Sequence, residues 1–242
     1  APKGRIMVAN VHKPGFKDWK ELVGETKNVL ENAQFAADKL VLSYSKDAST
    51  HLYVYSLDGK ELNEIKLPTV GRASFSGERG QKECFYSFAS FTVPGAIYQY
   101  DMAQNKSSVY TEPKVKFSLN QYTTEQVFFN SKDGTRVPMF LTYRKGLKRN
   151  GKNPVLIYGY GGFNVSLSPN FSSMRIPFLE NGGVYVQVNL RGGSEYGEEW
   201  HVAGTKMQKQ NVFDDFISAA EWLVSNHFTS KEHIAIMGGS NG

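Results

Sequence analysis

A short strand-like segment that runs into Gly-Gly-Ser-Asn-Gly at residues 238–242 constrains the fold more than any other feature. The segment itself, HIAIM at 233–237, has the apolar run that is typical of a buried strand. A strand followed by G-x-S-x-G predicts a nucleophile elbow, a sharp turn that exposes the hydroxyl of its serine, here Ser240. Glycines are expected there because the backbone is strained and side chains would collide with neighbouring elements. The pattern also occurs by chance in loops, so the surrounding elements have to support it.

The second half of the chain has the pattern of alternating strands and helices. Continuous apolar runs, which are typical of strands buried on both faces, occur at 155–158, 184–188 and 234–236. Apolar residues recur at helical spacing from Val212 to Asn226, and a shorter helix is expected from Met174 to Leu179. This alternation predicts a parallel, doubly wound sheet with Ser240 at the carboxyl end of a strand, where such sheets place their sites.

The first half contains an internal repeat of short strands. Leu52–Tyr55 and Ile97–Tyr100 are similar segments, and their first tyrosines are about 45 residues apart. A similar step backward reaches residues 5–9, which have the same strand character. A period in the forties is typical of β-propeller blades, although a two-sheet sandwich would also give short strands. Because a propeller needs about four blades to close, we expect only its last two to three blades here.

The pattern changes after Glu112-Pro113, and we expect two domains, residues 1–115 and 116–242. A hairpin is predicted at residues 132–135, where Lys-Asp-Gly-Thr separates two apolar segments. The chain begins with Ala1 and ends at the predicted elbow, so we expect it to be a piece of a longer polypeptide.

Composition excludes several classes of function. The net charge of +5 is spread along the chain, which argues against a nucleic-acid site, and no apolar stretch reaches the length of a membrane span. A single cysteine, Cys84, fits a reducing compartment, and we expect it to be a packed core residue of a cytoplasmic protein. No P-loop is present, and Asn164 stands where a dinucleotide fingerprint needs its third glycine. Glu198, Glu199 and His201 lack metal-site spacing, so we expect no metal and no cofactor.

A serine hydroxyl needs a base to remove its proton and donors to bind the developing oxyanion. The backbone N–H of Asn241, directly after Ser240, is the first expected donor. A second donor should come from a loop after an earlier strand, and the glycine-rich residues 158–163 follow such a strand. A purely structural glycine-rich turn remains open for that segment.

Four segments together resemble the prolyl oligopeptidase family: YGYGGF at 158–163, NLRGGSEYGEEWH at 189–201, KQNVFDDF at 209–216 and GGSNG at 238–242. The resemblance implies the first half of an α/β-hydrolase domain, with a doubly wound, mostly parallel sheet, preceded by the last blades of a β-propeller. It implies a serine endopeptidase that cleaves short peptides on the carboxyl side of proline through an acyl-enzyme. The propeller of this family caps the active site and admits oligopeptides, so the expected partners are proline-containing oligopeptides, and the longer protein is expected to be a monomer.

The resemblance also assigns residues. It makes Ser240 the nucleophile, gives the phenol O–H of Tyr160 and the backbone N–H of Asn241 to the oxyanion, and places Phe163 in the proline-binding pocket. On residue type alone, Phe163 could equally be an ordinary core phenylalanine. The polar, glycine-rich segment RGGSEYG at 191–197 follows a buried strand and could shape the site, but we expect Arg191 to form a structural network with a glutamate there.

In α/β-hydrolases the aspartate and histidine of the triad follow the serine, whereas all five histidines of this chain precede Ser240. We therefore expect the chain by itself to be inactive. Two alternatives remain open. Another α/β-hydrolase, such as an esterase or an acylaminoacyl peptidase, would turn over esters or blocked amino acids and ignore proline peptides. A non-catalytic interaction module becomes the better hypothesis if the chain is complete.

Overall fold

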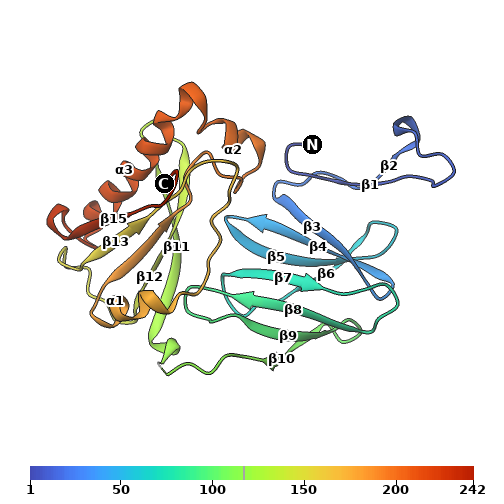
Figure 1. Ribbon diagram of the computed structural model, residues 1–242, viewed down its shortest axis with the longest axis horizontal. Helices are drawn as coiled ribbons and strands as arrows, with labels where there is room; N and C mark the ends of the chain where they lie inside the picture. The colour runs from blue at the N-terminus through green and yellow to red at the C-terminus, as the bar shows by residue number, and fades with distance from the viewer. Residues whose placement is uncertain (117) are drawn as a thin grey trace.

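Two four-stranded antiparallel sheets account for the repeat in the first half of the chain, in a computed structural model that describes residues 1–116 and 118–242 (Figure 1). The first sheet has the order β3 (Val29–Ala36), β4 (Lys39–Lys46), β5 (Ser49–Tyr55) and β6 (Glu61–Ile65). The second contains β7 (Arg72–Ser76), β8 (Glu83–Ala89), β9 (Ala96–Asp101) and β10 (Lys106–Thr111), again with sequential neighbours paired. Tyr53 and Tyr98 lie on the third strand of each sheet, which confirms the repeat.

Alternate residues of these strands form a shared apolar core between the two sheets. Val54 of β5, Phe75 of β7 and Phe88 of β8 are buried in it. Cys84 lies in the same core with no exposed surface and no disulfide, as its apolar surroundings in the sequence predict. Residues 5–9 contribute β1 (Ile6–Val8), which pairs with β2 (Lys20–Val23) in a two-stranded ribbon rather than in a four-stranded sheet. A 3₁₀ turn, η1 (Phe16–Asp18), connects them.

A five-stranded sheet forms the second part of the molecule. Its strands are β11 (Tyr122–Asn130), β12 (Arg136–Arg144), β13 (Val155–Tyr158), β14 (Val184–Val188) and β15 (Ile234–Met237). Their order is β11-β12-β14-β13-β15. β13 pairs in parallel with β14 and β15, whereas β11, β12 and β14 are antiparallel neighbours, so the parallel portion is its last three strands. The hairpin predicted at residues 132–135 joins β11 to β12.

Helices cover both faces of this sheet, which makes it doubly wound. On one face, Val212, Ala219 and Leu223 of α3 (Gln210–Ser225) pack with the apolar side chains of β13 and β14. On the other face, Ile176 and Leu179 of α1 (Ile176–Glu180) pack with Phe140 and Tyr185. The two helices expected from sequence are therefore confirmed. The shorter elements are η2 (Leu119–Gln121), η3 (Ser173–Arg175), α2 (Glu198–Val202), η4 (Lys206–Gln208) and η5 (Lys231–His233).

The prediction that residues 234–236 are buried on both faces is wrong. β15 lies at the end of the sheet order, and among the described residues it pairs on one side only, with β13. Ile236 consequently remains 70 % exposed and Met237 45 % exposed. The apolar side chains of α3 that face the same way, Phe213 and Ile217, are also about half exposed.

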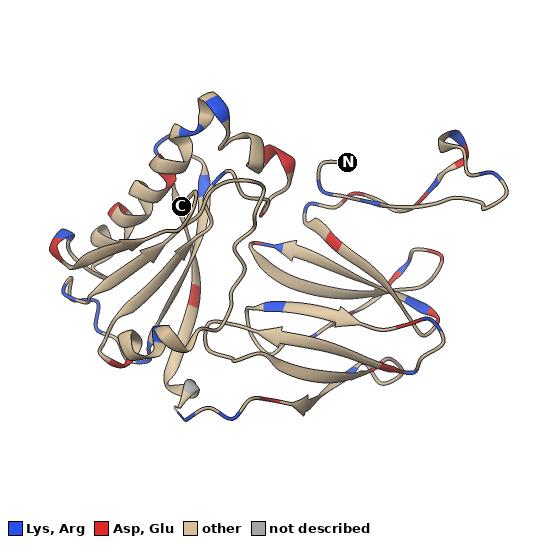
Figure 2. Cartoon of the chain, viewed as in Figure 1, with Lys and Arg blue, Asp and Glu red and all other residues tan. Residues whose placement is uncertain are grey.

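The two parts of the molecule contact each other through apolar and polar side chains. Phe91, from the β8–β9 connection, packs on Phe140 and Tyr185 of the five-stranded sheet, with ring centroids 5.6 Å and 5.9 Å apart. The Tyr196 hydroxyl donates a hydrogen bond of 2.8 Å to the carboxylate of Asp47. Figure 2 shows basic and acidic residues interspersed over both parts, as the even charge pattern of the sequence predicts. No helix of the described residues has the length and apolar character that a membrane crossing requires.

Candidate active site

The backbone turns sharply where β15 ends, at residues 238–242. Ser240 adopts a left-handed conformation with φ of +54°, and its side chain is exposed. The amide of Gly242 donates a 2.9 Å hydrogen bond to the carbonyl of Gly239, which closes the turn. A serine in this region of φ is strained, and such strain clusters at functional sites. The turn therefore has the backbone that a nucleophile elbow requires.

Two of the three glycines in this turn are required by close packing. A Cβ on Gly242 would lie 2.5 Å from the carbonyl oxygen of Gly159 and 3.2 Å from the Cα of Tyr160. A Cβ on Gly238 would lie 2.7 Å from the carbonyl oxygen of Gly242. Gly239 has open space where its Cβ would be. The elbow thus lies directly against the glycine-rich segment that follows β13.

Side chains join this glycine-rich segment to the elbow. The Asn241 side chain donates a 2.7 Å hydrogen bond to the carbonyl of Tyr160. Lys209 Nζ donates to the carbonyl of Gly161 at 2.8 Å and to Asn241 Oδ1 at 3.2 Å. Burial lowers the pKa of Lys209. Lys209 was not singled out by sequence reasoning, although it begins the segment KQNVFDDF at 209–216, whose conspicuous composition was the available signal.

Phe163 is exposed, and the interpretation of it as a core phenylalanine is wrong. Its side chain is 75 % exposed, and its φ of +52° places it in the left-handed region. Asn164, which follows it, has a φ of +58°. The Phe163 ring is therefore not part of the packed core of the described residues. Tyr160, three residues earlier, is half-buried.

No histidine of the described residues hydrogen-bonds to Ser240. The Oγ of Ser240 has no hydrogen-bond partner within the described part of the chain. Three of the five histidines have other polar partners. His51 Nδ1 lies 2.9 Å from the Glu64 carboxylate, and His201 Nδ1 lies 2.9 Å from the carbonyl oxygen of Gly192. His233 Nδ1 lies 2.8 Å from the hydroxyl of Ser230. The described part of the chain also contains no group of three or more side chains arranged to hold a metal ion.

Arg191 fixes the loop that packs against the glycine-rich segment. Its guanidinium is buried and donates to Asp215 at 2.6 Å and to Asp133 at 2.5 Å. The hydrogen bonds from Arg191 lower the pKa of Asp133 to about 2. The prediction of an Arg–Glu network was therefore wrong in the partner, since both carboxylates are aspartates. The next residue, Gly192, accepts a 3.1 Å hydrogen bond from the amide of Asn164.

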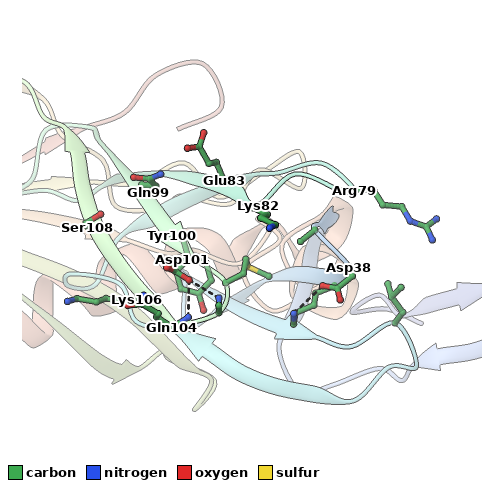
Figure 3. Close-up of a pocket in the computed structure, with 16 residues that line it drawn as sticks. Asp38, Arg79, Lys82, Glu83, Gln99, Tyr100, Asp101, Gln104, Lys106 and Ser108 are labelled. Atoms are coloured by element: carbon green, nitrogen blue, oxygen red, sulfur yellow. Dashed lines mark hydrogen bonds and ion pairs between the residues drawn. The ribbon is translucent and has the colours of Figure 1, made fainter.

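An apolar cavity of about 320 Å³ lies beneath the elbow. Its walls come from α3, β15 and the glycine-rich segment, including Tyr160, Phe216, Ile236 and Asn241. Neither Phe163 nor Ser240 lines it. A groove of about 1030 Å³ lies in the other part of the molecule, between the ends of the four-stranded sheets (Figure 3). There the carboxylate of Asp101 accepts hydrogen bonds from the backbone amides of Ala103 and Gln104. These bonds stabilise the turn that follows β9.

Comparison with known proteins decides what these two parts are. A model of the prolyl oligopeptidase N-terminal β-propeller domain matches residues 1–113, and a model of the prolyl oligopeptidase family matches residues 169–242. The chain belongs to the prolyl oligopeptidase family. The two four-stranded sheets are therefore propeller blades rather than a sandwich, and the five-stranded sheet is the start of an α/β-hydrolase domain.

Relatives match the whole chain. A prolyl endopeptidase of Elizabethkingia meningoseptica is 46 % identical over 243 residues, which cover 100 % of this chain and 34 % of that protein. A prolyl endopeptidase of Dictyostelium discoideum is 40 % identical over 93 % of this chain and 30 % of that protein. The chain thus spans about a third of the length of the curated relatives it matches.

Solved structures have the same fold. One, from a study of two prolyl endopeptidases, matches 100 % of this chain and 36 % of its own with a TM-score of 0.94 and 45 % identity. A second, prolyl oligopeptidase B from Galerina marginata bound to a 25-residue macrocyclization substrate, gives a TM-score of 0.93 at 33 % identity. It covers 100 % of this chain and 34 % of that one.

Proposed function

We propose that the natural protein containing this chain is a serine endopeptidase that cleaves short peptides on the carboxyl side of proline, through an acyl-enzyme on Ser240. The observation that carries the proposal is the left-handed, exposed Ser240 directly behind β15, with the Tyr160 segment hydrogen-bonded to Asn241 beside it. Two relatives that match the whole chain are named prolyl endopeptidases, which supports the choice of substrate class.

The elbow and the adjoining segment divide the chemistry between them. Ser240 Oγ attacks the carbonyl carbon of the proline residue, and the electron pair of the C=O bond moves to the oxygen as an oxyanion. Collapse of this intermediate breaks the C–N bond, the following residue leaves as a protonated amine, and water then hydrolyses the ester on Ser240. The backbone N–H of Asn241 and the phenol O–H of Tyr160 donate hydrogen bonds to that oxyanion. The proton of Oγ passes to a base, and we expect a histidine that follows Ser240 in the longer polypeptide, as in other α/β-hydrolases.

Phe163 provides a wall for the proline ring. A proline ring is rigid and apolar, and its nitrogen carries no hydrogen to donate. A site that selects it therefore needs an apolar, aromatic surface without a matching acceptor for that nitrogen. Phe163 is the large aromatic side chain that the segment next to the elbow leaves exposed.

The same proposal extends to organisation and setting. Residues 1–115 form the propeller part and residues 116–242 the catalytic part, with the boundary between β10 and β11. The substrates are proline-containing oligopeptides, and the longer protein acts as a cytoplasmic monomer. The single, buried, unpaired Cys84 supports a reducing compartment.

The test measures turnover of a chromogenic peptide with proline before the scissile bond and of the same peptide with alanine there. It uses the full natural polypeptide. We expect hydrolysis of the proline peptide, and its complete loss in Ser240→Ala. The matched control, Ser225→Ala at the exposed end of α3, should keep full activity.

Three outcomes would contradict the proposal. Retained turnover in Ser240→Ala would remove that residue as the nucleophile. Turnover of an ester or a blocked amino acid without turnover of the proline peptide would favour another α/β-hydrolase. Binding of proline peptides without hydrolysis would favour a non-catalytic module.

A further inference from the structure

The segment between β13 and α1, residues 159–175, crosses the boundary between the hydrolase sheet and the blades (Figure 1). Ser166 and Ser168 line a cavity of about 320 Å³ whose other walls come from β3, β4, β5 and β7. Ser166 and Leu167 also line a second cavity, of about 210 Å³, with side chains of the sheet. The segment contains no strand and no helix before η3, so its position depends on individual hydrogen bonds.

Hydrogen bonds to the backbone of Leu167 hold the middle of this segment. Its amide donates a 2.9 Å hydrogen bond to Glu195 Oε1. Its carbonyl accepts from Asn189 Nδ2 at 2.6 Å and from Gln187 Nε2 at 3.3 Å. Since Asn189 must present its NH₂ group to that carbonyl, the orientation of its amide is fixed. Glu195 and Asn189 together thus hold both polar groups of the Leu167 backbone.

Glu195 is buried without a cation. Its side chain is 2 % exposed, and Oε1 also accepts from Asn189 Nδ2 at 3.1 Å. Its second oxygen, Oε2, has no hydrogen-bond partner among the described residues. A Cβ on Gly193 would collide with Oε2 and lie 2.9 Å from the carbonyl oxygen of Val165, so a glycine is required beside this carboxyl.

The charged groups around Glu195 are engaged elsewhere. Arg191, on the same loop, is committed to Asp133 and Asp215. Tyr196, the next residue, donates to Asp47, and Arg136 lies near that hydroxyl rather than in an ion pair with Glu195. The residue after β14, Asn189, bonds to Glu195 through its neutral amide, and Gln187 of β14 bonds through its neutral amide to the carbonyl of Leu167. No described lysine, arginine or histidine forms an ion pair with this carboxyl.

We propose that Glu195 is a positioning residue that holds the 159–175 segment, and with it Tyr160 and Phe163, through a neutral carboxyl group bonded to the Leu167 amide. The neutral form is favoured because the carboxyl is buried with no cation beside it, and a buried, unpaired carboxylate carries a large desolvation cost. The expected effect of Glu195 on turnover rests on the proposed function, whereas its expected effect on the position of residues 159–175 does not.

The direction of the pH dependence follows from burial, which raises the pKa of Glu195 from 4.5 to about 7. When the segment opens, the carboxyl meets water and its pKa returns toward 4.5. Between pH 4.5 and about 7, the open form of the segment has released a proton that the closed form keeps. The equilibrium therefore shifts from the closed toward the open form as the pH rises through this range. Above that range both forms are ionised and no further loss is expected.

The first experiment measures hydrogen exchange of a peptide covering residues 163–171 in the full natural polypeptide, as a protection factor corrected for the intrinsic exchange rate at each pH. Protection of the Leu167 amide should fall on the order of 100-fold between pH 4.5 and 7, as a shift of this size allows. Glu195→Gln, which keeps one acceptor and one donor, should stay protected at every pH. Glu195→Ala should be unprotected at every pH, and Glu198→Gln, an exposed neighbour, should behave as the wild type.

Two results would overturn the proposal. One is wild-type protection that does not change from pH 4.5 to 7, and the other is a Leu167 amide that remains protected in Glu195→Ala. If Glu195→Ala fails to fold, the comparison of wild type with Glu195→Gln still decides, because the two must differ above pH 7 and agree near pH 4.5.

The second experiment measures KM and kcat separately for the proline peptide. Loss of positioning should raise KM about tenfold in Glu195→Ala while kcat changes less, because Phe163 is displaced from substrate before the reacting atoms are affected. Glu195→Gln should restore the KM. An unchanged KM in Glu195→Ala contradicts the positioning role. Complete absence of turnover in the wild type would contradict the proposed function and leave the exchange result standing by itself.

Discussion

The blades and the hydrolase part of this chain have left-handed backbone in different places. In the blades, the non-glycine residues with positive φ are Ala37, Asp47, Ala48 and Asn105, all at turns between paired strands. In the hydrolase part they are Phe163, Asn164, Lys206, His227 and Ser240, none of which lies in a turn between paired strands. The blades therefore derive their shape from strand pairing and apolar packing. The site needs side chains such as Asn241 and Lys209 to hold backbone that pairing does not fix.

The largest expected effect on stability lies in the blades. Phe88 is 1 % exposed in the core between the two four-stranded sheets. Phe88→Ala should lower the free energy of unfolding by about 3–5 kcal/mol through lost burial and a cavity. Turnover per folded molecule should not change. Urea unfolding of the full natural polypeptide measures the loss, with Phe88→Leu as a milder control. A loss below about 1 kcal/mol would show that the blade core tolerates the cavity.

Tyr160→Phe should show the opposite behaviour. Removal of one oxyanion donor should lower kcat by roughly 10²–10³ and leave stability unchanged, since the phenyl ring remains. Steady-state kinetics on the proline peptide and a urea midpoint together make the distinction. Full activity in Tyr160→Phe would remove its hydroxyl from the mechanism.

A smaller effect is expected at Lys209, which acts on the site through backbone rather than substrate. Lys209→Met keeps the length of the side chain but removes its hydrogen bonds to Gly161 and Asn241. We expect kcat/KM to fall on the order of tenfold, as for loss of one or two charged hydrogen bonds. Lys206→Met, an exposed neighbour, is the control. Equal kcat/KM in the two variants would show that Asn241 alone fixes the segment.

The smallest effect concerns Asp133, whose pKa the hydrogen bonds from Arg191 lower from 3.8 to about 2. The paired carboxylate stabilises the fold above pH 3.8, and that contribution is lost as the pH falls toward 2. Because its side chain is 45 % exposed, solvent screening reduces the contribution to about 1 kcal/mol. Asp133→Asn should lower stability by this amount at pH 7 and by progressively less as the pH falls through about 2. An equal loss at both pH values would contradict the ion-pair explanation.

Local patterns predicted the regular elements well. The 45-residue repeat, the hairpin at 132–135 and the helix from Val212 to Asn226 all appear, because each depends on residues that are near in sequence. Contacts between distant residues were missed. Arg191 pairs with Asp133, 58 positions away, and no local signal distinguishes that aspartate from a nearby glutamate. Lys209 was overlooked for the same reason, and the segment that contains Glu195 was expected to form an Arg–Glu network, whereas Glu195 bonds to the Leu167 amide on another loop.

The solvent exposure of apolar side chains was the other property that the sequence pattern did not predict. Residues 234–236 look like a strand buried on both faces, and residue type alone leaves open whether Phe163 is a pocket wall or a core residue, because side-chain polarity does not show what covers a side chain. The place of β15 in the strand order and the left-handed backbone at Phe163 leave both exposed. Residue type predicts what a side chain prefers, whereas topology decides what covers it.

The most direct test of the central claim treats the full natural polypeptide with a fluorophosphonate, which reacts with activated serines, and locates the label by peptide mass spectrometry. Ser240 should carry the label, Ser240→Ala should carry none, and prior incubation with a proline peptide should slow the reaction. Labelling of another serine, or an unlabelled Ser240 in protein that hydrolyses proline peptides, would contradict the assignment of Ser240 as the nucleophile.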